Sequence, residues 1–209
     1  MTTLLIVLFA LSLIYFTISE RFRTYSWLVG FQGLLLFGIS YFELDQVNTL
    51  NLLFIFAETI FFKTIVVPWQ LNRIISLTND TRIHRNTLPG YYTVILASLL
   101  LVVSYIIGNI LKTPVIDRIY LTVSLFAMFT AMLFIITRKK IFSHLIGFLI
   151  LENAVFLLSL AIGNEMPMLI NTGILLDIFI SVLILGTFMT KIGSEIHTLE
   201  AENLTRLKD

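Results

Sequence analysis

The chain has 209 residues, of which 57% are hydrophobic and only 13% are charged. Soluble domains carry roughly 25% charged residues, so this composition, with a mean hydropathy of +0.94, excludes a soluble globular fold. The absence of cysteine excludes disulfides, cysteine nucleophiles and thiolate metal sites, and a net charge of +1 gives no reason to expect a nucleic-acid partner. We therefore expect an all-α integral membrane protein.

Seven apolar segments can cross a bilayer, because a hydrocarbon core of about 30 Å needs about 20 helical residues. No basic residues precede the first segment and no small-residue cleavage pattern follows it, so we expect a retained anchor and not a signal peptide. Pro68 is expected to end the third segment, and Ile74–Leu77 beyond it to form a short interfacial helix. The seven segments are Thr2–Ser19, Tyr25–Tyr41, Asn51–Val67, Tyr91–Leu111, Ile119–Thr137, Ile141–Ile162 and Met166–Ile192.

The basic residues are distributed unequally between the two sides of this arrangement. Of the 14 Lys and Arg residues, eleven fall on one side, only Lys112 and Arg118 fall on the other, and Lys63 lies inside a span. Cytoplasmic loops are enriched in Lys and Arg, so the N-terminus is expected outside and the C-terminus in the cytoplasm. The tail after Gly193 places leucines among charges, which is typical of an amphipathic helix on a membrane surface or on a partner.

Four ionisable residues lie well inside the predicted spans: Glu58, Lys63, Glu152 and Asp177. Each costs on the order of 2.5–3.5 kcal/mol at the centre of a membrane helix, so a functional role is the default interpretation and a structural pair between helices is the alternative. Glu58 and Lys63 are about 140° apart on a helix and are expected to look outward, toward larger neighbouring subunits. Lys63 could equally extend its side chain to the cytoplasmic interface.

Glu152 and Asp177 are expected to lie at the same depth on adjacent helices. The short turn at Gly163–Glu165 joins these helices, and each acid lies about 18–20 Å below that turn. Two buried carboxylates at close range cannot both ionise cheaply, which suits a proton relay. His144 lies about 12 Å from Glu152 toward the cytoplasm. It would mark a proton entry path, and the alternative is a histidine that is merely interfacial.

Several classes of membrane protein are rejected by the positions of these residues. A retinal protein needs a lysine in the middle of the seventh span, where this chain has Asp177. A membrane cytochrome needs histidines at haem depth, whereas His84, His144 and His197 lie near the cytoplasmic edge. We expect no catalytic residues, no cofactor and no metal site in this chain.

The stretch from Gly147 to Ala154 resembles the acidic helix of the NuoK-type subunit of respiratory complex I. The resemblance implies a NuoK-like three-helix unit at 112–192, preceded by a four-helix extension at 1–111 and followed by a cytoplasmic tail at 193–209. Glu152 and Asp177 would be its two membrane carboxylates, with Asp177 standing where that family usually has Glu.

The longer chain is more similar to component E of the hydrogenase-4 family (HyfE-type). The motifs that carry this similarity are Lys63-x-x-x-x-Pro68, Glu152-Asn153, Thr172-x-x-x-x-Asp177 and Asn203-Leu-Thr-x-Leu-Lys208.

This resemblance implies a subunit of a complex-I-like membrane-bound hydrogenase or formate hydrogenlyase in the prokaryotic inner membrane. The candidate proton-relay residues are Glu152, Asp177, Glu58, Lys63 and His144; the resemblance covers Lys63, Glu152 and Asp177, whereas Glu58 and His144 are inferred from their positions alone. Antiporter-like membrane subunits would be its neighbours, and hydrophilic hydrogenase-type subunits would carry the nickel–iron and iron–sulfur chemistry. The translocated ion would be a proton or sodium.

Two other functions remain open. The chain could belong to a multisubunit cation/proton antiporter without redox chemistry, or it could be a scaffold that packs between antiporter-like subunits. The hydrogenase interpretation is favoured over the antiporter because NuoK-type antiporter homologues usually lack the long N-terminal extension.

Overall fold

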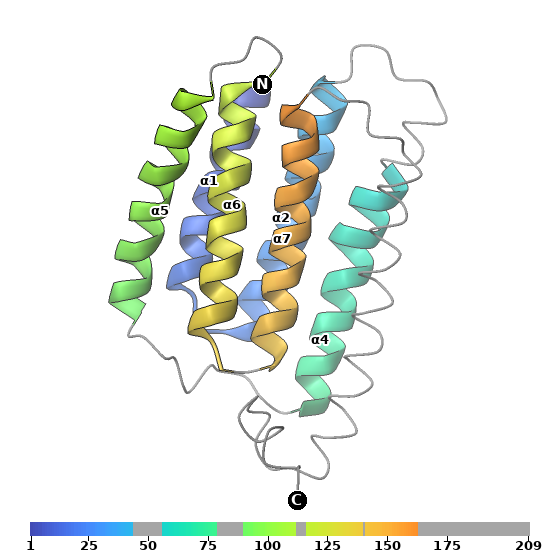
Figure 1. Cartoon of the computed structure of the whole chain (residues 1–209). Coiled ribbons are helices and arrows are strands. Elements are labelled where there is room, and N and C mark those ends of the chain that lie inside the picture. The colour runs from blue at the N-terminus through green and yellow to red at the C-terminus, as the bar shows by residue number, and fades with distance from the viewer. Residues whose placement is uncertain (44–55, 79–89, 112–115, 140, 163–209) are drawn as a thin grey trace, which may run out of the picture.

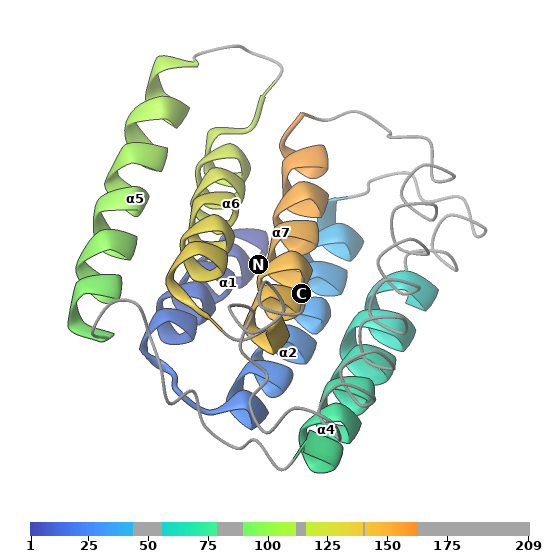
Figure 2. The same ribbon diagram turned by 60° about the horizontal axis from the view of Figure 1, so that its bottom comes forward.

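A computed structural model describes residues 1–43, 56–78, 90–111, 116–139 and 141–162. Every long element in these ranges is a helix, and the helices form one bundle with α4 and α5 at opposite edges (Figures 1 and 2). Helices that follow one another in the chain run antiparallel, except that η1 continues into α4, whereas α1 is parallel to its neighbour α6 and α2 to its neighbour α7. The all-helical expectation is therefore confirmed for this part of the chain. The elements are α1 (Thr2–Ile18), α2 (Phe22–Glu43), the π-helix η1 (Phe56–Val66), α4 (Val67–Thr78), α5 (Gly90–Ile110), α6 (Arg118–Thr137) and α7 (Ile141–Ala161).

Four of these helices are long and apolar enough to cross a membrane, namely α2, α5, α6 and α7. Helix α1 is apolar but shorter, with 17 residues. The predicted bounds of α1, α5, α6 and α7 agree with the observed bounds to within one residue at each end. Helix α2 is longer than the predicted span because it continues into polar residues at both ends. The predicted seventh span, Met166–Ile192, lies outside the described residues.

The expectation that Pro68 ends the third helix is wrong. The π-helix η1 passes directly into α4, and Pro68 is the second residue of α4. Proline has no N–H, but the first turn of an α-helix needs none, so the change from π to α geometry before Pro68 accommodates it. Ile74 and Ile75 are buried in the continuing helix. The stretch that was expected to form a separate interfacial helix is therefore the second half of α4.

Rings from four helices meet at the end of the bundle where α1 ends and α2 begins. Tyr25 stacks on Phe16 with 4.6 Å between ring centroids, and Phe134 meets both rings edge-on at 5.2 Å. Phe22 contacts Phe142 of α7 at 4.7 Å. Such edge-on pairs are preferred by aromatic quadrupoles. We call this the basic end, because Arg21, Arg23, Arg138 and Lys139 also lie here.

Helix α5 is held against the bundle by a stripe of small residues. Its buried residues are Thr93, Ala97, Ser104 and Gly108. A Cβ added at Gly108 would meet the Thr122 hydroxyl of α6, so the backbones approach closely there. Small residues at helix contacts are the usual device in lipid, where no hydrophobic drive brings helices together. Most of the larger side chains of α5 are exposed, among them Tyr91, Leu99 and Tyr105.

Candidate functional site

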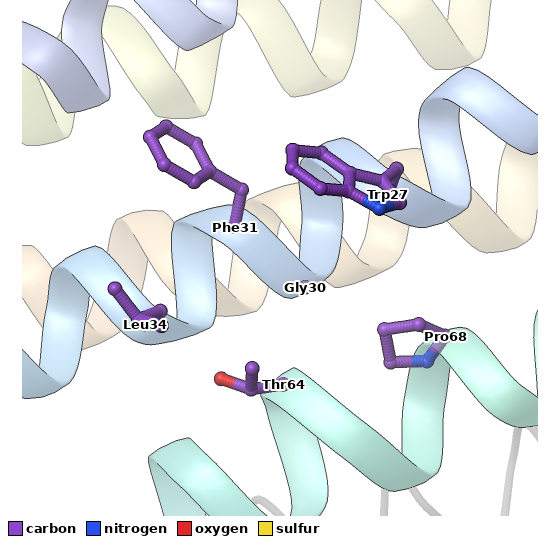
Figure 3. A pocket seen from close by; sticks show the side chains of 6 residues that line it. All are labelled: Trp27, Gly30, Phe31, Leu34, Thr64 and Pro68. Carbon is purple, nitrogen blue, oxygen red and sulfur yellow. The ribbon is translucent and has the colours of Figure 1, made fainter.

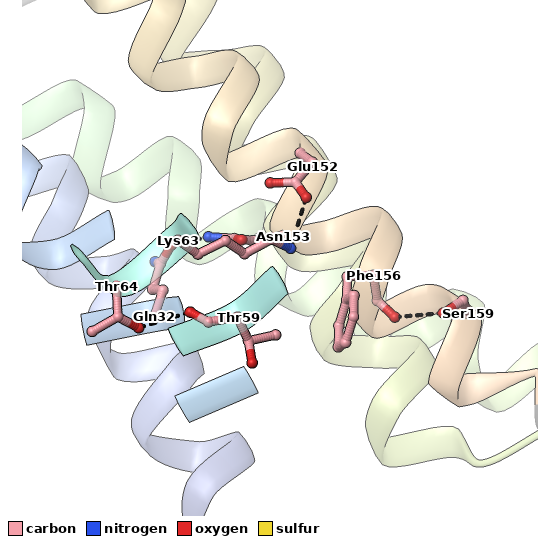
Figure 4. A network of polar contacts seen from close by, with 8 residues as sticks. All are labelled: Gln32, Thr59, Lys63, Thr64, Glu152, Asn153, Phe156 and Ser159. Atoms are coloured by element: carbon pink, nitrogen blue, oxygen red, sulfur yellow. Dashed lines mark hydrogen bonds and ion pairs between the residues drawn. The ribbon is translucent and has the colours of Figure 1, made fainter. Parts of the chain in front are cut away.

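The described part of the bundle contains a buried ion pair between η1 and α7. The Nζ atom of Lys63 lies 2.7 Å from Oε1 of Glu152, and the two side chains are only 4% and 8% exposed. Figure 4 shows the lysine side chain reaching across from η1 to the glutamate on α7. Such short contacts between ionised groups are stronger than neutral hydrogen bonds. The two charges compensate each other where water is excluded.

Gly33 on α2 allows this reach. A Cβ at Gly33 would lie 2.8 Å from Cβ of Lys63 and 3.0 Å from the Thr64 hydroxyl. Any larger residue at this position would push η1 away from α2. Lys63 can therefore pass alongside α2 to meet a carboxylate on the helix that packs on the other side.

The lysine makes a second contact with α7 through Phe156, one turn beyond Glu152. Its Nζ lies 4.6 Å from the centre of the Phe156 ring. A cation over an aromatic face is attracted by the ring quadrupole, and more strongly when it is desolvated. Glu152 and Phe156 thus hold the same ammonium group from one face of α7.

Next to the ion pair, amides and a hydroxyl form a buried chain of hydrogen bonds across three helices. Asn153 Nδ2 donates to Gln32 Oε1 at 3.2 Å, and Gln32 Nε2 donates to Ser12 Oγ at 3.0 Å. The Ser12 hydroxyl donates in turn to the carbonyl oxygen of Phe9 at 2.6 Å. We call Asn153, Gln32 and Ser12 the amide chain. It links α7, α2 and α1 beside Glu152.

The π-helical winding of η1 is matched by a side-chain hydrogen bond of the same span. Thr64 Oγ1 donates to the carbonyl oxygen of Thr59, five residues earlier, at 2.8 Å. π-Helical turns are rare and often occur at functional sites. Here the winding includes Lys63 and immediately precedes the α-helical turn that contains Pro68.

The other predicted site residues are placed as follows. Glu58 belongs to η1, but its side chain lies outside the described residues, as does the whole of Asp177. The structure therefore does not test the predicted pairing of Glu152 with Asp177. His144 is half-buried near the start of α7, where its Nε2 lies 2.9 Å from the carbonyl oxygen of Arg138.

The two expectations for where the Lys63 side chain lies are both wrong. The side chain neither looks outward to a neighbouring subunit nor extends to the membrane interface, because it is buried against Glu152. Both expectations considered only the helix that carries Lys63. The glycine on α2 and the acid on α7 decide where its side chain goes, and an ion pair in a low dielectric is far stronger than one in water.

Sequence reasoning did not assign a role to Gln32, Gly33, Asn153 or Phe156. A signal was present for Gln32 and Asn153, because an amide inside an apolar span usually hydrogen-bonds to another helix. No signal in the sequence marks Gly33 or Phe156 in this way, since their roles depend on which helices are neighbours.

The ion pair sets what this site can do chemically. Removing one partner would leave the other as an unpaired buried charge, which typically costs about 3–5 kcal/mol. Among the described residues, no group of three or more His, Asp or Glu side chains could hold a metal ion.

No protein-family model matches the chain, and no curated protein or solved structure matches it significantly. What the fold and site define is a class: a multi-pass helical membrane protein with a buried lysine–glutamate pair between two of its helices.

Proposed function

We propose that the chain is a membrane subunit of a complex-I-like membrane-bound hydrogenase, of the formate hydrogenlyase or hydrogenase-4 type. The observation that carries this proposal is the buried Lys63–Glu152 pair, since ionisable groups at membrane depth typically belong to ion pathways. The motifs that resemble component E of the hydrogenase-4 family include both of these residues. In this proposal seven helices cross the prokaryotic inner membrane, with the N-terminus outside and the C-terminus in the cytoplasm.

The proposed role is to hold and release charge during proton or sodium translocation. Charge interactions fall off slowly in a low-dielectric interior, so a change in a neighbouring antiporter-like subunit would alter how favourable the ion pair is. Glu152 could then take up a proton, which would weaken its ion pair with Lys63. Asp177, expected at the same depth, would form one proton-accepting station with Glu152. The redox chemistry would take place in hydrophilic hydrogenase-type subunits, and this chain would have no catalytic site of its own.

A structural role is the second candidate, and the amide chain favours it. Asn153, Gln32 and Ser12 bind three helices together without any ionisable group. If the adjacent ion pair only continues this link toward η1, it would fasten helices and carry no ion. The two functions differ in what happens when both charges are removed together.

The deciding experiment uses the assembled complex with the double variant Lys63→Met/Glu152→Gln. This variant removes both charges at once, so neither partner is left buried and unpaired. We expect it to assemble and to lose proton pumping driven by the redox reaction of the complex. Glu152→Asp, which keeps the charge, is the matched control and should retain part of the activity. Pumping by the double variant at the wild-type rate would overturn the relay and leave the structural role.

The identity of the complex is tested separately by the chains that co-purify with a tagged full-length chain. Hydrogenase large and small subunits together with antiporter-like subunits are expected. Recovery of antiporter-like subunits alone would instead assign the chain to a multisubunit cation/proton antiporter.

A further inference from the structure

A groove of about 280 Å³ lies between α2 and the η1–α4 helix, away from the ion pair. Figure 3 shows aromatic and aliphatic side chains of α2 on one side of it and Thr64 and Pro68 on the other. Its lining residues are Trp27, Gly30, Phe31, Leu34, Thr64 and Pro68. The two helices approach closely at Gly30, where a Cβ would lie 2.8 Å from Cγ of Pro68.

One wall of the groove carries two aromatic rings. The rings of Trp27 and Phe31 are nearly parallel, at 12°, with centroids 6.3 Å apart. Trp27 is 74% exposed, so this wall is open to the surroundings of the bundle. A hydrocarbon chain lying along the groove would cover both rings. Tryptophan is also typical of the boundary between the bilayer core and the headgroups.

Two arginines lie beyond the groove toward the basic end. The Ser26 hydroxyl donates to the carbonyl oxygen of Pro68 at 3.0 Å, which fixes these residues at one level. Because α2 and α4 are antiparallel, Arg23 and Arg73 lie about 4.5 Å and 7.5 Å from that level in the same direction. Both are exposed. Arg23 is one turn before Trp27 on the same face of α2.

The second tryptophan of the chain repeats this arrangement on α4. Arg73 lies 5.9 Å from the ring centre of Trp69, which is 60% exposed. Each of the two helices that form the groove therefore presents an exposed tryptophan and, one turn nearer the basic end, an exposed arginine. Arg23 shares the face of α2 that lines the groove, whereas Arg73, five residues after Pro68, lies about 140° around α4 from it. An apolar groove with an arginine beyond one end is complementary to a molecule with an anionic head and an apolar tail.

We propose that this groove binds one anionic phospholipid. The phosphate lies at Arg23, and an acyl chain lies along Trp27 and Phe31. Charge complementarity selects a phospholipid over a partner helix, because an apolar partner helix would leave Arg23 without a counter-charge. The inference rests on the groove and on Arg23, and it does not depend on the proposed function.

The test uses the full chain with Trp69→Phe, which leaves Trp27 as the single tryptophan, in phosphatidylcholine vesicles. Fluorescence quenching of Trp27 by dibrominated phosphatidylglycerol is compared with quenching by dibrominated phosphatidylcholine at equal mole fraction. We expect the anionic lipid to bind about fivefold more strongly, as one arginine at a membrane surface allows, with the preference reduced by salt.

Arg23→Gln should abolish this preference, and Arg23→Lys should retain most of it. Arg118→Gln, which removes an exposed arginine at the start of α6, is the matched control and should leave it unchanged. Equal quenching by the two lipids in the parent protein would mean that the groove holds bulk lipid. Absence of quenching by either would mean that protein covers the groove. Either result, or an unchanged preference in Arg23→Gln, would overturn the proposal.

Discussion

The helices at the two edges of the bundle are held to their neighbours by different interactions. At one edge, α5 packs on its neighbours through the small residues Thr93, Ala97, Ser104 and Gly108. At the other, η1 is joined across α2 to α7 by a lysine, a glutamate and a phenylalanine. Close packing places no charge in the membrane. The ion pair places two charges in the membrane, which costs free energy that close packing of helices does not. This contrast is the physical reason to look for function at the second edge.

The largest effect on stability should come from breaking the ion pair on one side only. Lys63→Met or Glu152→Gln alone leaves a buried group without its partner, with an expected loss of about 3–5 kcal/mol. The double variant should recover most of this loss. Thermal unfolding of the detergent-solubilised protein, arranged as a double-mutant cycle, measures the coupling. Additive effects of the two single variants would contradict the pairing.

A smaller loss should follow from closing the gap that lets Lys63 pass α2. Gly33→Ala places a Cβ 2.8 Å from Cβ of Lys63, an atom close to the backbone that can move little. Overpacking of this kind typically costs about 1–3 kcal/mol. Gly108→Ala is the comparison at the other edge, where the obstructing atom is a rotatable Thr122 hydroxyl. We expect Gly108→Ala to be the milder change in the same unfolding assay, and the reverse order would show that the two contacts have been misjudged.

Disrupting the amide chain should lower stability by less than Gly33→Ala does. Replacing Asn153 with Leu removes its hydrogen bond to Gln32, and polar contacts between membrane helices are worth about 0.6–2 kcal/mol. The double variant Asn153→Leu/Gln32→Leu should lose less stability than the sum of the losses in the two single variants, because neither amide is then left without its partner. Unfolding midpoints of the three variants test this. A double variant worse than the sum would contradict the 3.2 Å bond between these side chains.

The smallest effect is expected at the outward face of α5. Leu99 is 54% exposed in the bundle, and Leu99→Val should change stability by no more than about 0.5 kcal/mol. A large loss in the isolated chain would mean that α5 packs differently from the arrangement described above. A loss seen only in an assembled complex would place a partner subunit on this face.

The helices were largely predictable because apolar length alone decides them. The bounds of α5, α6 and α7 followed from where polar residues interrupt the hydrophobic runs. The continuation of η1 through Pro68 was not predictable in this way, because a change of helix type before a proline leaves no mark in an apolar sequence.

The site was predictable only in its parts. Lys63 and Glu152 stood out individually, because charges are expensive in lipid. Their pairing could not be derived, since it depends on Gly33 of a third helix and on which helices are neighbours. Depth along the chain pairs Glu152 with Asp177, the nearest acid at the same expected depth, and gives no reason to choose the cation 89 positions earlier.

The central claim is that Lys63 and Glu152 form a direct ion pair inside the membrane. Solid-state NMR of the full chain in lipid bilayers measures it most directly, through dipolar coupling between ¹⁵N-labelled lysine Nζ and ¹³C-labelled glutamate carboxyl carbon. The 2.7 Å contact predicts a strong coupling that disappears in Lys63→Arg, where the labelled amine is absent, and in Glu152→Gln, where the labelled carboxyl is absent. A spectrum without such a coupling, or one unchanged by both substitutions, would contradict the pair.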